Sequence, residues 1–141
     1  MNMGKNIYAS FRDKQQKEFN SFPSFFAFNE TQLKEGMARL GVTDMKELYK
    51  SAGMFYRKTD AEKLHAMLNR LDTEMREQFK DDAFLYDAFY YELSNHEFCI
   101  TYDETEALDA LGLTQEEVVQ DTRMSKIFLK ARGDYMANAV C

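Results

Sequence analysis

The stretch DAFLYDAFYYELSNHEFCITYD, residues 82–103, decides the expected fold. Its first half carries five aromatic side chains in the eight residues from Phe84 to Tyr91. A helix that is apolar nearly all round is normally a buried one. In the second half, apolar residues alternate with more polar ones, which is the period-two pattern of a half-buried strand: Phe98, Ile100 and Tyr102. We therefore predict a central helix to about Leu93, followed by a strand over 98–102.

The rest of the chain predicts two more strands and several helices. Short apolar runs at 25–28 and 53–58 favour strands. Helical spacing and capping pairs such as Asn29 with Gln32 predict about six helices, and Thr43 is expected to cap one or two turns through Leu48 and Tyr49. The predicted fold class is α+β, with a small, three-stranded, largely antiparallel sheet packed by helices. The core is expected to include Phe26, Phe28, Phe55, Leu68, Leu71, Phe89, Phe98, Ile100 and Phe128.

Composition limits the class of protein. A chain of 141 residues predicts a single domain, 1–141, and 45% hydrophobic content is too rich for disorder. No apolar run approaches the roughly 18 residues that cross a bilayer, and no secretory signal is visible at the N-terminus. Two cysteines do not make a disulfide framework, so a cytoplasmic, reduced protein is expected.

Possible catalytic and metal-binding residues gather around His96 and Cys99, with Glu92 and Glu97 nearby. A zinc site needs about four N or S ligands, and the chain has only one other His and one other Cys. A nucleophilic thiolate would be disfavoured among these carboxylates. No Gly-rich phosphate loop or nucleophile elbow is present. We expect no metal, no cofactor and no enzymatic activity. A small enzyme using Cys99 and His96 is kept as a third hypothesis, after the two non-enzymatic functions given below.

The charge distribution gives the only functional lead. Residues 81–121 contain 12 acidic residues and no Lys or Arg, whereas both flanking segments are net positive. Capping and ordinary solvation explain part of this block, because acids in first helical turns are favoured by the helix dipole. A surface of one sign also attracts a partner of the opposite sign. The candidate partner-binding residues are Asp103, Glu104, Glu106, Asp109, Glu116, Glu117 and Asp121.

Three stretches carry a resemblance: FFAFNETQLKEG at 25–36, GMFYRKTDAEKLH at 53–65 and YELSNHEFCITYDETEALDALGLTQEEV at 91–118. Together they resemble a group of small, functionally uncharacterised proteins carried by bacterial phages, plasmids and other mobile elements, and small acidic proteins of such elements include the anti-CRISPR inhibitors of RNA-guided nucleases. The resemblance implies a non-enzymatic inhibitor whose acidic face binds a basic cleft on a host protein, with a CRISPR effector nuclease as the expected partner. Direct binding to nucleic acid or membrane is not expected. The alternative is a structural or regulatory interaction module without a nucleic-acid-related partner.

Overall fold

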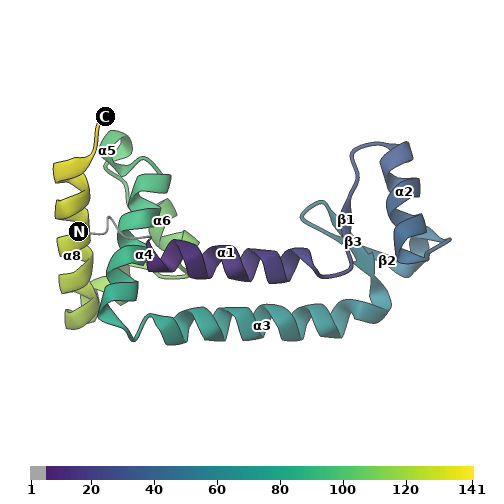
Figure 1. Ribbon diagram of the computed structural model, residues 1–141, viewed down its shortest axis with the longest axis horizontal. Coiled ribbons are helices and arrows are strands. Elements are labelled where there is room, and N and C mark those ends of the chain that lie inside the picture. Colours follow the sequence, from purple (N-terminus) through teal and green to yellow (C-terminus); the bar gives the residue numbers. More distant parts are fainter. Residues whose placement is uncertain (1–5) are drawn as a thin grey trace. The chain divides into compact units, whose positions relative to one another are not determined.

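The computed structural model describes residues 6–141, and its fold is α+β, as predicted (Figure 1). Most of the described chain is helical, and three short strands form one antiparallel sheet. The elements follow in this order: α1 (Ile7–Asn20), β1 (Phe25–Phe26), α2 (Glu30–Leu40), η1 (Met45–Glu47), β2 (Leu48–Ser51), β3 (Met54–Arg57), η2 (Lys58–Asp60), α3 (Ala61–Gln78), α4 (Asp82–Asn95), α5 (Phe98–Thr101), α6 (Thr105–Ala110), α7 (Gln115–Gln120) and α8 (Thr122–Asn138).

The chain divides into two compact units. One comprises Lys14–Glu74, and the other comprises Met75–Cys141 together with residues before Lys14. Each unit has its own cluster of buried apolar side chains. The expectation of a single domain therefore stays a prediction, and the two units are described separately. Among residues 6–141, no helix combines the length and the apolar character needed to cross a membrane.

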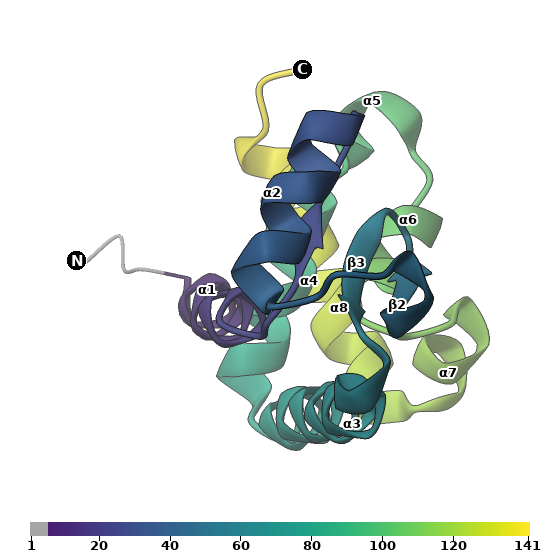
Figure 2. The same ribbon diagram turned by 90° about the vertical axis from the view of Figure 1, so that its right-hand side faces the viewer.

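The sheet lies in the unit Lys14–Glu74, with β3 between β1 and β2. The strands β2 and β3 and helix α2 of this unit face the viewer in Figure 2. β2 and β3 form a hairpin whose two loop residues, Ala52 and Gly53, both have positive φ, as in the type I′ turns that suit the twist of a hairpin. Helix α2 packs against β1, because Gly36 leaves room for the ring of Phe25. Asn29 caps α2 by accepting a hydrogen bond from the backbone N–H of Gln32, as predicted.

The core of the second unit is built on α4 and α8, which lie side by side (Figure 1). α4 is the apolar helix that the sequence predicts, and its buried residues include Phe84, Leu85 and Phe89. The ring of Phe89 meets that of Phe128 on α8 edge-on, with centroids 5.1 Å apart. Short helices α6 and α7 cover this core with Leu108 and Val118.

The predicted strand at 98–102 is wrong, since Phe98–Thr101 is helix α5. Its backbone groups are satisfied locally, for example by the N–H of Tyr102 donating to the carbonyl of Phe98 at 2.8 Å. A half-buried strand needs a neighbouring strand, and the sheet belongs to the other unit. The third strand is instead β2, where the sequence had predicted a helical turn. A short 3₁₀ turn capped by Asp44 precedes it, and the hairpin loop then pairs it with β3.

Part of the predicted core is also wrong. Phe55, Leu71, Phe89, Phe98 and Phe128 are buried, as expected. Phe28 is 86% exposed and Ile100 is 62% exposed, and Phe26 and Leu68 are exposed as well. Phe25 is buried in place of Phe26, because neighbouring side chains of a strand point to opposite faces and only one face of β1 is covered.

Candidate functional site

The acidic candidate residues lie on α6, α7 and the segments that flank them. Three of them act as helix caps or turn residues. Asp103 accepts a hydrogen bond from the backbone N–H of Thr105, Glu117 completes a capping box with Thr114, and Asp121 caps α8 through the N–H of Met124. Hydrogen bonds from the hydroxyl and the backbone N–H of Thr105 hold the pKa of Asp103 below its ordinary value. Each of these carboxylates therefore already has a structural task.

Two of the seven carboxylates lie near cationic or potentially cationic groups. Glu106 lies 3.4 Å from Nδ1 of His96, and Glu117 lies 3.9 Å from a guanidinium nitrogen of Arg76. Glu104 and Asp109 have no ion pair within residues 6–141, and Glu116 accepts a hydrogen bond only from the side chain of Gln120, one turn later. Neither α6 nor α7 contains a Lys or Arg. We call the carboxylates of half-buried Glu104 and of exposed Asp109 and Glu116 the acidic face.

A small apolar groove adjoins the acidic face between α6, α7 and α8. Its volume is about 230 Å³, and buried Leu108, Val118 and Phe128 form its apolar lining. Val119 and Leu129 also line it and are 74% and 51% exposed. Glu104 lies in its wall, as does Arg132, whose guanidinium lies 5.5 Å from the centre of the Phe128 ring. The groove is therefore a small exposed apolar patch with charged side chains around it.

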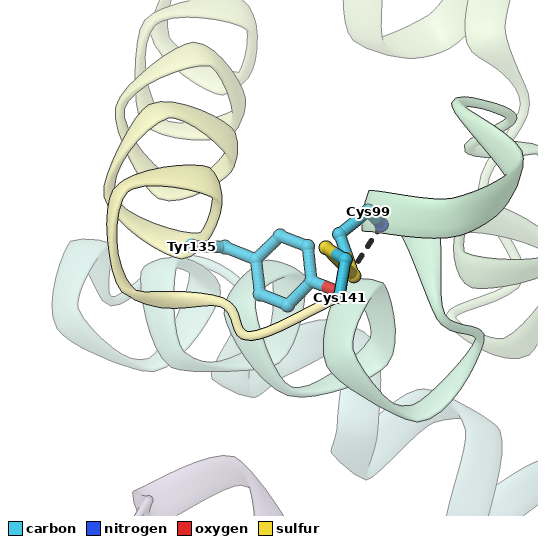
Figure 3. The surroundings of a disulfide bond; sticks show 3 residues. All are labelled: Cys99, Tyr135 and Cys141. Atoms are coloured by element: carbon cyan, nitrogen blue, oxygen red, sulfur yellow. Dashed lines mark hydrogen bonds between the residues drawn. A yellow bond between two sulfur atoms is a disulfide. The ribbon is translucent and has the colours of Figure 1, made fainter.

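Cys99 does not present a free thiol, because it forms a disulfide bond with Cys141 (Figure 3). The thiolate that a catalytic Cys99 would supply is therefore absent in this state. Within residues 6–141, no group of three or more His, Cys, Asp or Glu side chains is placed to hold a metal ion. His96 instead lies between two carboxylates, with Nε2 3.5 Å from Glu92 and Nδ1 near Glu106.

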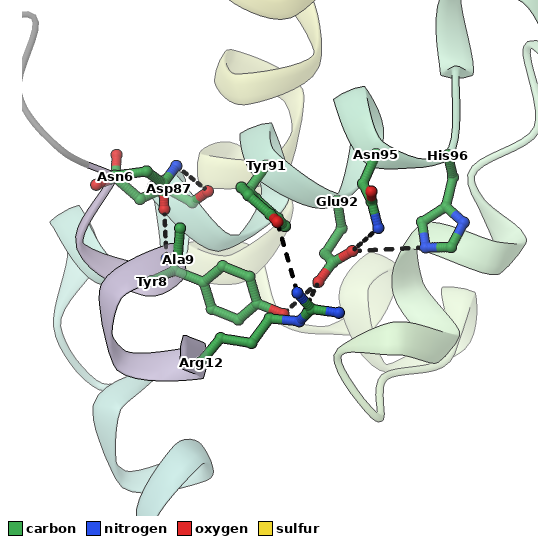
Figure 4. Close-up of polar contacts among 9 residues, drawn as sticks. All are labelled: Asn6, Tyr8, Ala9, Arg12, Asp87, Tyr91, Glu92, Asn95 and His96. Atoms are coloured by element: carbon green, nitrogen blue, oxygen red, sulfur yellow. Dashed lines mark hydrogen bonds and ion pairs between the residues drawn. The ribbon is translucent and has the colours of Figure 1, made fainter. Parts of the chain in front are cut away.

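Glu92 is the centre of a buried polar network (Figure 4). The carboxylate is 0% exposed and accepts hydrogen bonds from the hydroxyl of Tyr8 and the amide of Asn95. Arg12 lies 3.7 Å away and supplies positive charge. Burial raises the pKa of Tyr8 well above its ordinary 10.0, and its hydrogen bond to Glu92 and the charge of that carboxylate raise it further. A buried charge needs such partners, so the network stabilises the contact between α4 and the start of α1.

The unit Lys14–Glu74 contains a larger open cleft of about 640 Å³. Phe22 and Met67 supply apolar surface in it, and its guanidinium groups are already paired. Arg57 donates to Asp60 at 2.8 Å, and Arg70 contacts both Glu18 and Glu74. The two guanidinium groups of the cleft are therefore already engaged, and we take the acidic face with its groove as the candidate site.

Comparison with models of protein families shows the family of this chain. A family model described as "Family of unknown function (DUF7659)" matches residues 7–134. This chain belongs to that family. The match spans both compact units, so the two units are common to one family model. Comparisons with curated proteins and with solved structures gave no match.

The sequence did not predict three features of these sites: the exposed pair Val119 and Leu129, the buried carboxylate of Glu92 and the partner of Cys99. Two signals were present. Glu92 is the only charged residue in the second half of an otherwise apolar helix, which indicates a buried charge with partners. Val118 and Val119 are consecutive on a short helix, so both cannot face the same core. Nothing in the sequence indicated that residue 141 reaches α5.

Proposed function

We propose that this protein is a non-enzymatic inhibitor that binds a basic nucleic-acid site of a host protein through the acidic face. The observation that carries the proposal is the acidic face, whose three carboxylates lie on α6, on α7 and at the N-terminus of α6, two helices without a Lys or Arg. Carboxylates can take the place of phosphates, since Lys and Arg side chains form charge-assisted hydrogen bonds with both. The partner's basic cleft would then be occupied without any nucleic acid.

An RNA-guided nuclease is the first partner to test. Such enzymes hold nucleic acid in positively charged channels and use paired arginines to read a short motif of target DNA. The resemblance to mobile-element proteins supports this choice, because anti-CRISPR inhibitors belong to that class. The proposal includes a cytoplasmic site of action, no cofactor and no direct contact with nucleic acid or membrane.

The alternative is an interaction module whose partner is unrelated to nucleic acid. The exposed pair Val119 and Leu129 favours it, because carboxylates that imitate phosphates bind through charge and do not require an apolar groove. The alternative predicts that Val119→Ser with Leu129→Ser weakens binding more than charge reversal does.

The test measures binding of the purified protein to a guide-loaded Cas9-type nuclease, together with competition against its target DNA. Glu104→Lys, Asp109→Lys and Glu116→Lys are combined in one variant. A matched control combines Glu30→Lys, Glu35→Lys and Glu62→Lys, which change the net charge equally at exposed positions of the other unit. Melting curves check that both variants fold.

The proposal expects the parent and the control variant to compete with target DNA and the acidic-face variant to lose binding by about a hundredfold or more. Affinity should fall steeply with salt, as the Debye length shortens from about 10 Å at 0.1 M to about 3 Å at 1 M. Equal binding by all three proteins, at low and high salt alike, would rule out the acidic-mimic mechanism. Loss of binding only in the variant that combines Val119→Ser with Leu129→Ser would favour the alternative.

A further inference from the structure

The disulfide between Cys99 and Cys141 joins two segments that are otherwise weakly held. The two residues are 42 positions apart, and their Cα atoms are separated by 6.0 Å, within the usual range for disulfides. Cys99 lies on the one-turn helix α5, and Cys141 lies beyond the end of α8 (Figure 3). The bond therefore connects the segment after α8 to the wall of the unit formed by α4 and α5.

Helix α5 has few other attachments. Phe98 is its only buried residue, and the backbone N–H of Cys99 donates a hydrogen bond to the hydroxyl of Tyr135 at 3.2 Å. The residues on both sides of the helix, Glu97 and Tyr102, have φ values of 53° and 55°. Side chains disfavour this left-handed region, so the tertiary contacts of α5 must hold both residues there.

The segment after α8 is held even less. The N–H of Ala139 donates to the carbonyl of Tyr135, and beyond it Val140 and Cys141 are exposed. Val140 and Cys99 line an open cleft of about 350 Å³ with Tyr90, Ser94 and Tyr135. Cys141 is exposed while Cys99 is partly buried, so an external thiolate reaches the sulfur of Cys141 more easily.

We propose that the Cys99–Cys141 disulfide is a reversible redox site that fastens α5 to residues 139–141 at the wall of this cleft. The reductant is a dithiol, and the oxidised state is the one the structure shows. This inference does not depend on the acidic face or on the identity of its partner. It places in this protein a modification site that responds to the redox state of its surroundings.

The exchange proceeds in two steps. A thiolate of the dithiol attacks Sγ of Cys141, the S–S bond breaks, and Cys99 leaves as a thiolate that takes up a proton. The mixed disulfide joins one sulfur of the reductant to Sγ of Cys141. The second thiolate of the reductant then attacks that reductant sulfur, and Cys141 leaves as a thiolate and is protonated in turn. The protons come from the dithiol through solvent. The protein gains two thiols, and the dithiol becomes a cyclic disulfide, so two electrons and two protons are transferred.

The experiment uses the full chain, equilibrated in mixtures of reduced and oxidised dithiothreitol and then alkylated and weighed by mass spectrometry. We expect monomers with either no label or two labels, and a Cys99–Cys141 linked peptide in the oxidised sample. Hydrogen exchange of intact protein should show at least about tenfold faster exchange at 98–102 after reduction, with residues 84–93 of α4 unchanged. Cys141→Ser should show the same faster exchange without any reductant.

Three results would overturn the proposal. Alkylation of both cysteines in fully oxidised monomer would show that the bond does not form. Unchanged exchange at 98–102 after cleavage would show that the bond does not fasten α5. Loss of protection across 84–93 in both the reduced parent and Cys141→Ser would show that the disulfide supports the whole unit and is no local redox site.

Discussion

The ring of Phe25 occupies the space that a side chain at Gly36 would need. A Cβ atom built on Gly36 overlaps the ring carbons of Phe25, and both residues are buried. Phe25 also stacks on Phe55 of the central strand, with ring centroids 5.2 Å apart. A glycine in the middle of α2 therefore lets the helix approach the sheet closely, at the expense of helix propensity.

Replacing Gly36 with Ala should destabilise the protein. Alanine favours a helix by about 1 kcal/mol, but overpacking against Phe25 costs about 1–3 kcal/mol, and the backbone next to a ring has little room to move. We expect a net decrease in the free energy of unfolding, measured by denaturant titration. Gly133 of α8 is the matched control, since nothing lies within 4 Å of a Cβ placed there. Gly133→Ala should stabilise by about 0.5–1 kcal/mol, and equal effects of the two substitutions would show that α2 does not pack on Phe25.

Truncating Phe89 should have the large effect of a core cavity. Its side chain is buried between α4 and α8 and meets Phe128 edge-on. We expect Phe89→Ala to lower the free energy of unfolding by about 3–5 kcal/mol. Phe28 provides the comparison, because it is 86% exposed and its truncation should change stability by about 0.5 kcal/mol or less. A loss under about 1 kcal/mol in Phe89→Ala would contradict the central position of α4.

The stability should fall with alkaline pH through Tyr8. Its pKa is raised in the folded state, so its contribution is complete below the ordinary value of 10.0 and is lost as pH rises above it, when the unfolded chain ionises first. One such group gives a slope of about 1.4 kcal/mol per pH unit. Denaturant titrations between pH 9 and 11 should show a shallower decline for Tyr8→Phe than for the parent. This variant should also be less stable at neutral pH, because Glu92 loses a hydrogen bond. Parallel curves for the two proteins would mean that Tyr8 is not buried against Glu92.

The local structure was largely predictable, since it depends on neighbours in the chain. The apolar run of α4 and the cap of Asn29 on α2 are both found where the sequence places them. The acidic block was equally visible, because charge is a property of composition. The sequence could not show which of its carboxylates would lie beside a cationic or potentially cationic side chain. In the structure, Glu106 lies beside His96 and Glu117 lies near Arg76.

The sequence by itself determined the apolar helix α4, the cap of α2 and the sign of the charge on α6 and α7. Only the tertiary structure decided the fate of residues 98–102, the burial of Phe25 over Phe26, and the pairing of Cys99 with Cys141. The physical reason is the range of the interactions concerned. Helical hydrogen bonds and caps join residues within about four positions, whereas a strand, a covered face or a disulfide needs a partner from a distant part of the chain. An alternating apolar pattern such as Phe98, Ile100 and Tyr102 becomes a strand only where another strand meets it, and here none does among the described residues.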